Sequence, residues 1–193
     1  MKKILIIQGN PHPGSYCSAL ATTYQQTAGL AGHQAELIHL YDLNFDLSLR
    51  HGYRQRTEWE PDLHDAWAKI QAADHLVWIY PIWWGTAPAL LKGFIDRVFL
   101  PGKTFKYRSE KSVFWDKLLK HKSARMIVTM DSPAWYDYMM YGRAGIRAMK
   151  TATLAFCGLS PVKVTVLDKI KLRSPQALEK CLRKIERLAL KGK

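Results

Sequence analysis

Short apolar runs rich in β-branched residues alternate with helically periodic segments along almost the whole chain. The runs cover residues 3–8, 35–40, 75–80, 125–130 and 162–167. After each run, apolar residues recur every third or fourth position, in segments that begin at Ser15, Pro61, Pro88, Gly142 and Ser174. Five strands alternating with five helices predict an α/β fold: a parallel sheet with helices on both faces, joined by right-handed crossovers.

The 193 residues suit one domain spanning 1–193. Nearly half of them, 48%, are apolar, which argues against disorder. The apolar stretches are too short for a membrane span, and the first ends at Gln8, too early for a signal peptide. Cys17, Cys157 and Cys181 are widely spaced and form no C-x-x-C motif. This cysteine pattern argues against a disulfide scaffold and indicates a reducing, cytoplasmic location.

In an open doubly wound sheet, ligands bind beyond the carboxyl ends of the strands, where the strand order reverses. The commoner order for five strands is 2-1-3-4-5, which places the crevice between the loops after the first and third strands. The first of these loops covers residues 9–18 and leads into a helix N-terminus, which favours an anion. It lacks G-x-G-x-x-G, and Ser15-Tyr16 stands where a Walker A loop needs Lys-Ser/Thr. An uncharged loop of hydroxyls and amides suits the phosphate of FMN, although an ordinary turn with Ser15 as N-cap explains the local sequence equally well.

The loops after the third and fourth strands are rich in aromatic residues. Trp83 and Trp84 are adjacent in the first of them and predict flat walls for a planar ring, unless one tryptophan packs inward. The second covers residues 129–142 and contains Asp131, which is either a ligand contact or a turn cap. Together with the loop after the first strand, they make three loops at one edge of a parallel sheet, and this arrangement predicts a large planar ligand.

Two motifs resemble the flavodoxin-fold NAD(P)H:quinone oxidoreductases. They are G-N-P-H-P-G-S-Y-C-S-A-L from Gly9, and Y-P-I-W-W-G-T-A-P-A-L-L-K-G-F-I-D-R-V-F-L-P-G-K-T-F from Tyr80 to Phe105. The F-C-G at 156–158 also fits, and the likeness covers nearly the whole chain in order and spacing. It implies a homodimer that binds FMN or FAD. Such an enzyme passes a hydride from NADH or NADPH to the flavin and then to a quinone or similar acceptor, in a ping-pong cycle.

The resemblance also implies positions for the flavin. Ser15, Tyr16 and Cys17 would hold its phosphate. The ring and ribityl chain would contact Pro81, Ile82, Trp83, Trp84 and Gly85, and the other ring edge would face Thr129, Met130, Asp131 and Ser132.

The chain departs from the family pattern at several of these positions. Asn10, counted here with the cofactor-binding residues, often aligns with His in the family, and Cys17 with Asn. The loop after the fourth strand commonly reads T-T-G-G rather than T-M-D-S. His12 and Tyr138 are the candidates for assisting hydride transfer. The family's FAD-using members have a long C-terminal extension that this chain lacks, so the resemblance favours FMN over FAD.

Other polar residues have simpler interpretations. Tyr53, Arg54, Arg56 and Trp59 either line a substrate slot or cover the sheet edge. Asp96 and Arg97 are expected in structural or dimer contacts, and the histidine spacings indicate no metal site. Two alternative functions remain: a flavodoxin-like electron carrier, and a regulatory flavoprotein subunit of a membrane transport system.

The net charge of +13 lies in two blocks. Residues 101–125 contain eight basic and two acidic side chains, and residues 163–193 contain ten and three, so the rest is neutral. A basic chain raises nucleic acid as a partner, but no motif for base contacts is present. The blocks are interpreted as a solvated surface, or as a field that attracts anionic NAD(P)H.

Overall fold

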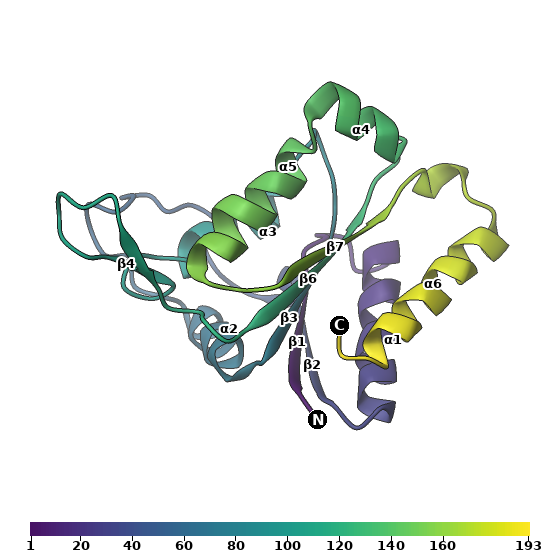
Figure 1. The fold of residues 1–193 in the computed structure, drawn as a ribbon, viewed down its shortest axis with the longest axis horizontal. Helices are drawn as coiled ribbons and strands as arrows, with labels where there is room; N and C mark the ends of the chain where they lie inside the picture. The colour runs from purple at the N-terminus through teal and green to yellow at the C-terminus, as the bar shows by residue number, and fades with distance from the viewer.

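Five parallel strands form the central sheet of the computed structural model, which describes residues 1–193 (Figure 1). The strands are β1 (Lys3–Gln8), β2 (Gln34–His39), β3 (His75–Pro81), β6 (Ser123–Thr129) and β7 (Val162–Leu167). Their order is β2-β1-β3-β6-β7, with every pair parallel. This confirms the predicted order 2-1-3-4-5, because β6 and β7 are the fourth and fifth strands of this sheet.

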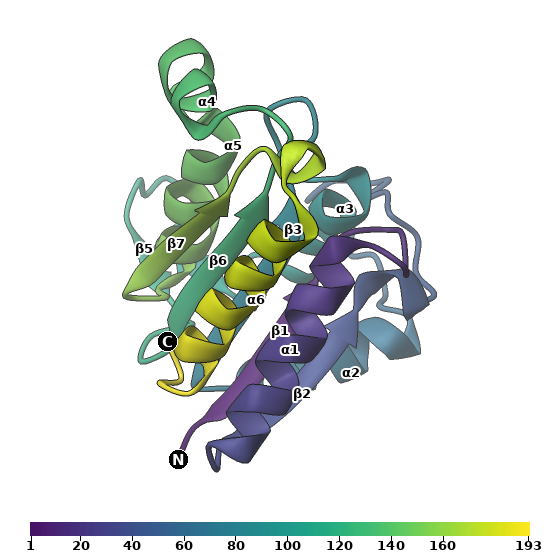
Figure 2. The same cartoon turned by 90° about the vertical axis from the view of Figure 1, so that its right-hand side faces the viewer.

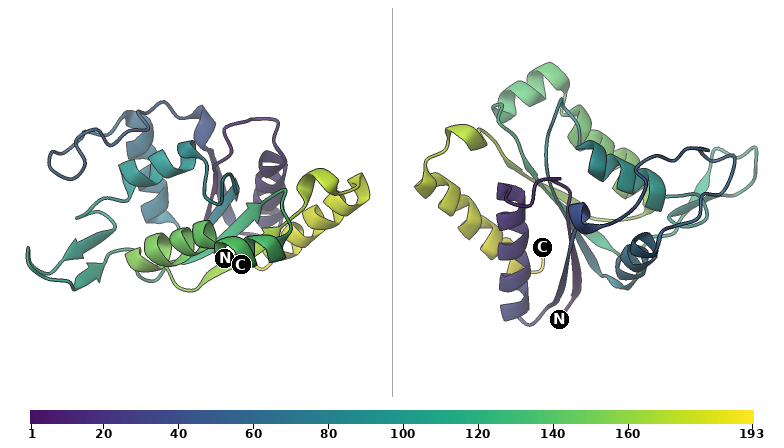
Figure 3. Two further views of the ribbon diagram at one scale, coloured as in Figure 1. Left: turned by 90° about the horizontal axis from the view of Figure 1, so that it is seen from above. Right: turned by 180° about the vertical axis from the view of Figure 1, so that it is seen from behind.

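Helices cover both faces of the sheet. On one face α1 and α6 lie side by side, and the other carries α2, α3 and α5 (Figures 2 and 3). Their bounds are α1 (Tyr16–Leu30), α2 (Pro61–Ala72), α3 (Ala89–Val98), α5 (Ala144–Arg147) and α6 (Pro175–Ala189). A π-helical segment, η2 (Ala148–Ala155), continues α5, and short 3₁₀ turns occur at η1 (Leu40–Asp42) and η3 (Ile170–Leu172). No helix has the length and apolar character needed to cross a membrane.

The apolar strands explain the two-layer core. Side chains of successive strand residues point to opposite faces, so Ile4 and Ile6 pack under α1 and α6 while Leu5 and Ile7 pack under α2 and α3. All seven residues of β3 are buried. A strand that is buried on both faces has a continuous run of apolar residues in the sequence. The positions of the strands could therefore be predicted from the apolar runs.

The segment after β6 differs from the prediction. We expected a loop over residues 129–142 followed by one helix from Gly142 to Cys157, but a separate helix, α4 (Ala134–Tyr141), comes first. Pro133 precedes it, and Gly142 ends it in the left-handed conformation with φ of 56°. Most of its side chains are exposed, and its apolar residues are not confined to one face, so the sequence shows no amphipathic pattern that would predict a helix.

The first basic block forms a hairpin, which was not predicted from the sequence. Strands β4 (Phe105–Tyr107) and β5 (Trp115–Lys117) pair antiparallel and project from the body of the molecule (Figure 1). The hairpin is attached at its base, where the ring of Trp115 stacks on Phe156 with centroids 4.3 Å apart. Its exposed lysines and arginine explain the local excess of positive charge.

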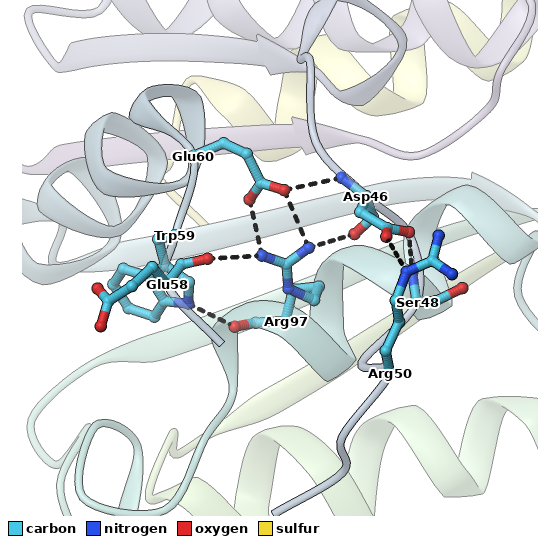
Figure 4. Close-up of polar contacts among 7 residues, drawn as sticks. All are labelled: Asp46, Ser48, Arg50, Glu58, Trp59, Glu60 and Arg97. Carbon is cyan, nitrogen blue, oxygen red and sulfur yellow. Dashed lines mark hydrogen bonds and ion pairs between the residues drawn. The ribbon is translucent and has the colours of Figure 1, made fainter. Parts of the chain in front are cut away.

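A buried arginine fixes the long segment between β2 and α2. The Arg97 guanidinium, from α3, is 1% exposed and binds both carboxylate oxygens of Glu60, at 2.7 and 3.1 Å (Figure 4). It also donates to the carbonyl oxygens of Asp46 and Glu58, while the Trp59 indole donates to the Arg97 carbonyl at 2.7 Å. Arg97 is thus structural, and Trp59 covers α3.

The neighbouring Asp96 has a different partner. Its carboxylate pairs with Lys92 at 2.7 Å, one turn earlier on the exposed face of α3. Both residues of the Asp96-Arg97 sequence therefore make structural contacts, as expected.

Candidate functional site

Three loops are tied together at the carboxyl edge of the sheet. The N–H of Gly9, after β1, donates to the carbonyl of Ile79 at 2.8 Å. The N–H of Ile82, after β3, donates to the carbonyl of Thr129 at 2.7 Å. The Cys17 sulfur, at the start of α1, lies 3.4 Å from the Thr129 hydroxyl oxygen. The loops after β1, β3 and β6 are therefore joined at the edge where the strand order reverses and where a ligand was expected.

The loop after β1 ends in a capped helix N-terminus. Ser15 is extended, and its hydroxyl oxygen accepts from the N–H of Ser18 at 3.3 Å. The N–H groups of Tyr16 and Cys17 occupy the first turn of α1, where no acceptor inside the helix exists. Because these donors and the helix dipole face the loop, the site favours an anion without any basic side chain.

A buried glutamine supports this loop and was not identified from the sequence. Gln8, the last residue of β1, is fully buried, and its amide nitrogen lies 3.4 Å from the hydroxyl oxygens of both Ser15 and Ser18. Its amide oxygen has no protein partner. A polar residue at the end of an apolar strand run was the signal available in the sequence.

The side chains of Tyr16 and Cys17 have structural roles. The Tyr16 hydroxyl donates to the carbonyl of Leu178 in α6 at 2.7 Å, and burial, with a smaller effect of Cys181, raises its pKa to about 12. Burial also raises the pKa of the Cys17 thiol, with hydrogen bonds from Thr129 and Asn10 opposing the effect. These two residues therefore offer backbone N–H groups rather than charged side chains to a ligand.

Asn10 and His12 shape the same loop. The Asn10 side chain is 9% exposed, and its amide oxygen accepts from the N–H of His12 at 2.9 Å. This is an Asx-type turn, in which a side chain replaces a backbone acceptor. The His12 side chain is exposed beside Gly14. Its part in hydride transfer stays a prediction.

The two tryptophans occupy a tight turn. Trp83 and Thr86 exchange both backbone hydrogen bonds, each at 2.9 Å. Between them Trp84 and Gly85 have φ of 50° and 73°, the signature of a type I′ turn. The Trp84 side chain is fully exposed and Trp83 about half exposed, so neither ring packs into the core. Pro81 is buried at the end of β3, and Ile82 is half-buried beside it.

The loop after β6 is less available to a ligand than we expected. Met130 is buried, and its N–H donates to the carbonyl of Leu167 at 3.0 Å. Asp131 forms an ion pair with Lys171 at 3.0 Å and accepts from the backbone N–H of that residue at 3.3 Å. These contacts support the turn-capping alternative for Asp131. Thr129 is buried, and Ser132 is half-buried next to the start of α4.

Tyr138 lies on the exposed surface of α4. The guanidinium carbon of Arg143 stands 5.3 Å from the centre of its ring, a cation–π arrangement. Arg143 follows Gly142 in a second left-handed position, with φ of 53°. The structure thus gives Tyr138 a cationic neighbour that the sequence did not indicate, and its catalytic role remains a prediction.

The donor set of these loops fits a flavin mononucleotide better than a metal. No three His, Cys, Asp or Glu side chains come together in a metal-binding arrangement. The capped N-terminus of α1 offers uncharged hydrogen-bond donors to a phosphate. The Gln8 amide oxygen beneath the loop has no hydrogen-bond partner in the protein. Trp83 and Trp84 present exposed aromatic rings.

Comparison with known proteins agrees with the fold described above. The model of a family described by a flavodoxin-like fold matches residues 2–189. An uncharacterized NAD(P)H oxidoreductase of Haemophilus influenzae is 28% identical over 179 residues, covering 90% of this chain and 87% of its own. An FMN-dependent NADH:quinone oxidoreductase of Macrococcus caseolyticus is 28% identical, with 87% of each chain covered. The crystal structure of Smu.1420 from Streptococcus mutans superposes with a TM-score of 0.83 at 30% identity, covering 97% of this chain and 98% of that one.

Proposed function

Since this chain belongs to the family with a flavodoxin-like fold, we propose that it is an FMN-dependent NAD(P)H oxidoreductase that reduces quinones or related aromatic acceptors. The observation that best supports this proposal is that the capped, uncharged N-terminus of α1 and the tryptophan turn both lie where the strand order reverses. The names of the Haemophilus and Macrococcus relatives support the reaction type. Residues 1–193 act as one flavin-binding domain, and its three unpaired cysteines fit a reducing cytoplasm.

When bound, FMN supplies hydride transfer between a nicotinamide and an acceptor. The N–H groups of Tyr16 and Cys17, with the Ser15 hydroxyl, would hold its phosphate. Trp83 and Trp84 would orient its ring and exclude water from one side, and the backbone N–H of Gly85 would offer the ring a hydrogen-bond donor. NADH or NADPH and then the acceptor occupy one aromatic slot in turn, which gives ping-pong kinetics.

The exposed face of α4 favours a homodimer. It presents Trp135, Tyr138, Met139, Met140 and Tyr141, all exposed, and Trp84 is fully exposed on the turn after β3. A contiguous set of exposed aromatic and methionine side chains of this kind marks an interface. A second copy covering it would also shield the slot from water. Sedimentation of Met139→Lys as a monomer, with the unchanged chain as a dimer, tests this assignment.

Anaerobic titration tests the function most directly. Protein saturated with FMN should lose its oxidised flavin absorption on addition of NADPH or NADH, and should recover it with a soluble quinone. Steady-state turnover should give parallel double-reciprocal lines. If neither nicotinamide bleaches the flavin, the oxidoreductase assignment is wrong. Bleaching without multiple turnovers would instead favour an electron carrier, and co-purification with a transport protein would favour a regulatory subunit.

A further inference from the structure

A second cluster of polar side chains lies at the amino edge of the sheet, opposite the flavin loops. Here β3, β6 and β7 begin, with His75 paired to Ser123 and Arg125 paired to Lys163. Residues two apart on a strand share a face, so these four side chains all point toward the layer of α1 and α6. The end of the chain, at Lys193, returns to this edge beside α6 (Figure 2).

Arg125 is a buried cation without a counter-charge. Its side chain is 6% exposed and donates to the Thr165 hydroxyl at 2.8 Å, but its Nε has no acceptor. It takes part in no ion pair, whereas the equally buried Arg97 is neutralised by Glu60. Burial lowers the pKa of the Arg125 guanidinium, since desolvation opposes the charged form. An uncompensated buried charge is costly, so an anionic partner would stabilise this edge.

His75 adds a second unsatisfied group. The residue is 3% exposed, and its Nδ1 lies 2.8 Å from the Ser123 hydroxyl oxygen, while its Nε2 has no partner. Burial, followed by the charges of Lys2, Arg125 and Lys163, lowers the His75 pKa to about 4. The ring is therefore neutral at pH 7, and in the tautomer in which Nδ1 accepts from Ser123, the Nε2–H is free to donate.

A cavity of about 220 Å³ adjoins His75. Its lining includes Ser123 and three lysines, Lys2, Lys163 and Lys193, and no acidic side chain. The main-chain carboxylate of Lys193 already accepts a hydrogen bond from the Tyr24 hydroxyl at 3.1 Å. Lys2 is oriented by donating to the carbonyl of Gly192 at 2.9 Å. Lysine ammonium groups, a hydroxyl and an imidazole thus line one cavity, which is large enough to hold a polyatomic anion.

We propose that this cavity binds a multiply charged anion of the phosphate class, at a site separate from the flavin loops. Lys2 and Lys163 together match two negative charges better than a single carboxylate does. Such an anion accepts a hydrogen bond from His75, so the unsatisfied Nε2 gains a partner, and its charge also lowers the cost of the buried Arg125 nearby. The source of the phosphate is either the free ion or the terminal group of a larger metabolite.

Thermal unfolding of FMN-saturated protein tests the proposal, because excess FMN fills the loop after β1. At constant ionic strength, replacing chloride with about 20 mM phosphate should raise the midpoint by about 4 °C, the shift expected for a dissociation constant near 1 mM. Pyrophosphate should act at lower concentration if the natural ligand is a larger phosphate compound. Acetate should have no effect.

Matched variants locate the response. Lys2→Ala combined with Lys163→Ala should abolish the phosphate shift, whereas Lys180→Ala combined with Lys184→Ala, on the exposed face of α6, should retain it. An equal shift in all variants would overturn the proposal. So would no shift in the unchanged protein, which would mean that the cluster is already neutralised, for example by the carboxylate of Lys193.

A spectroscopic measurement complements the melting curves. Bound phosphate places negative charge beside His75, so the pKa of its ring, followed by NMR, should rise by about one unit or more. The Lys2→Ala, Lys163→Ala variant should show no phosphate-dependent rise. An unchanged His75 pKa in the unchanged protein at saturating phosphate would contradict binding in this cavity.

Discussion

The backbone of Gly145 lies directly against the carbonyl oxygen of Gly85. A methyl group on Gly145 would overlap that oxygen and would come within 2.7 Å of the α-carbon of Thr86. The start of α5 is thereby fitted onto the turn that carries Trp84, so the helix after β6 and the loop after β3 hold one another in place.

Gly145→Ala should therefore disturb the tryptophan turn. We expect at least a tenfold loss of FMN affinity, measured by fluorescence quenching, because the turn must move away from the first loop. Gly29→Ala is the matched control: it also lies in a helix, its added methyl meets nothing within 4 Å, and it should raise stability by about 0.5–1 kcal/mol. Unchanged FMN affinity in Gly145→Ala would show that the contact does not position the site.

Trp84 stores strain in the same turn. A bulky side chain at φ of 50° costs about 1 kcal/mol or more, and its ring gains nothing from packing because it is fully exposed. Trp84→Gly should leave the free energy of unfolding equal or higher by about 1 kcal/mol, while weakening FMN binding and quinone turnover. Urea denaturation and flavin titration measure the two effects, and Trp84→Phe should restore binding. A Trp84→Gly protein that is both less stable and fully active would contradict this.

Removing the Arg97 side-chain charge should be strongly destabilising. Arg97→Met leaves the Asp46 and Glu58 carbonyls and the Glu60 carboxylate without their donor, at a cost of about 3 kcal/mol. Lys92→Met breaks an exposed pair on the same helix and should change stability by less than about 0.5 kcal/mol. Urea denaturation compares the two, and similar losses would mean that Arg97 is not the anchor of the segment before α2.

The free energy of unfolding should decrease as the pH falls, because His75 titrates at a lower pH in the folded chain than in the unfolded chain. Its pKa is about 4 in the folded chain against an ordinary value of 6.5, so between these values the unfolded chain binds a proton that the folded chain does not. In phosphate-free buffer this group should remove about 3 kcal/mol as the pH falls from 6.5 to 4. His75→Gln should flatten that part of the profile measured by urea denaturation. An identical slope in both proteins would exclude His75 as the source.

Much of the local structure around the candidate site could be predicted because it is encoded locally in the sequence. The strand ends, the Ser15 cap and the paired tryptophans are each encoded within a few residues, and a parallel sheet brings the ends of its strands to one edge. The side-chain contact of Tyr16 could not be predicted in this way, and the sequence left Asp131 open between a ligand contact and a turn cap. Their partners, Leu178 and Lys171, are distant in the chain, so only folding brings them together.

Two elements escaped prediction for physical reasons. Helix α4 buries little, so its sequence has no apolar stripe to signal a helix. The β4–β5 hairpin has only three residues in each strand, and Trp115 is stabilised by Phe156 from another part of the chain. Elements that tertiary contacts stabilise, and that have no regular apolar periodicity, are difficult to predict from the sequence.

The sequence by itself determined the alternation of buried strands and helices, and with it the sheet order and the edge that carries the proposed flavin-binding loops. It also determined the net charge of +13 but not its meaning. Only the tertiary structure decided that Arg97 is neutralised by Glu60 while Arg125 is not, because a charge is satisfied by neighbours in space. That difference separates a structural anchor from the proposed anion site.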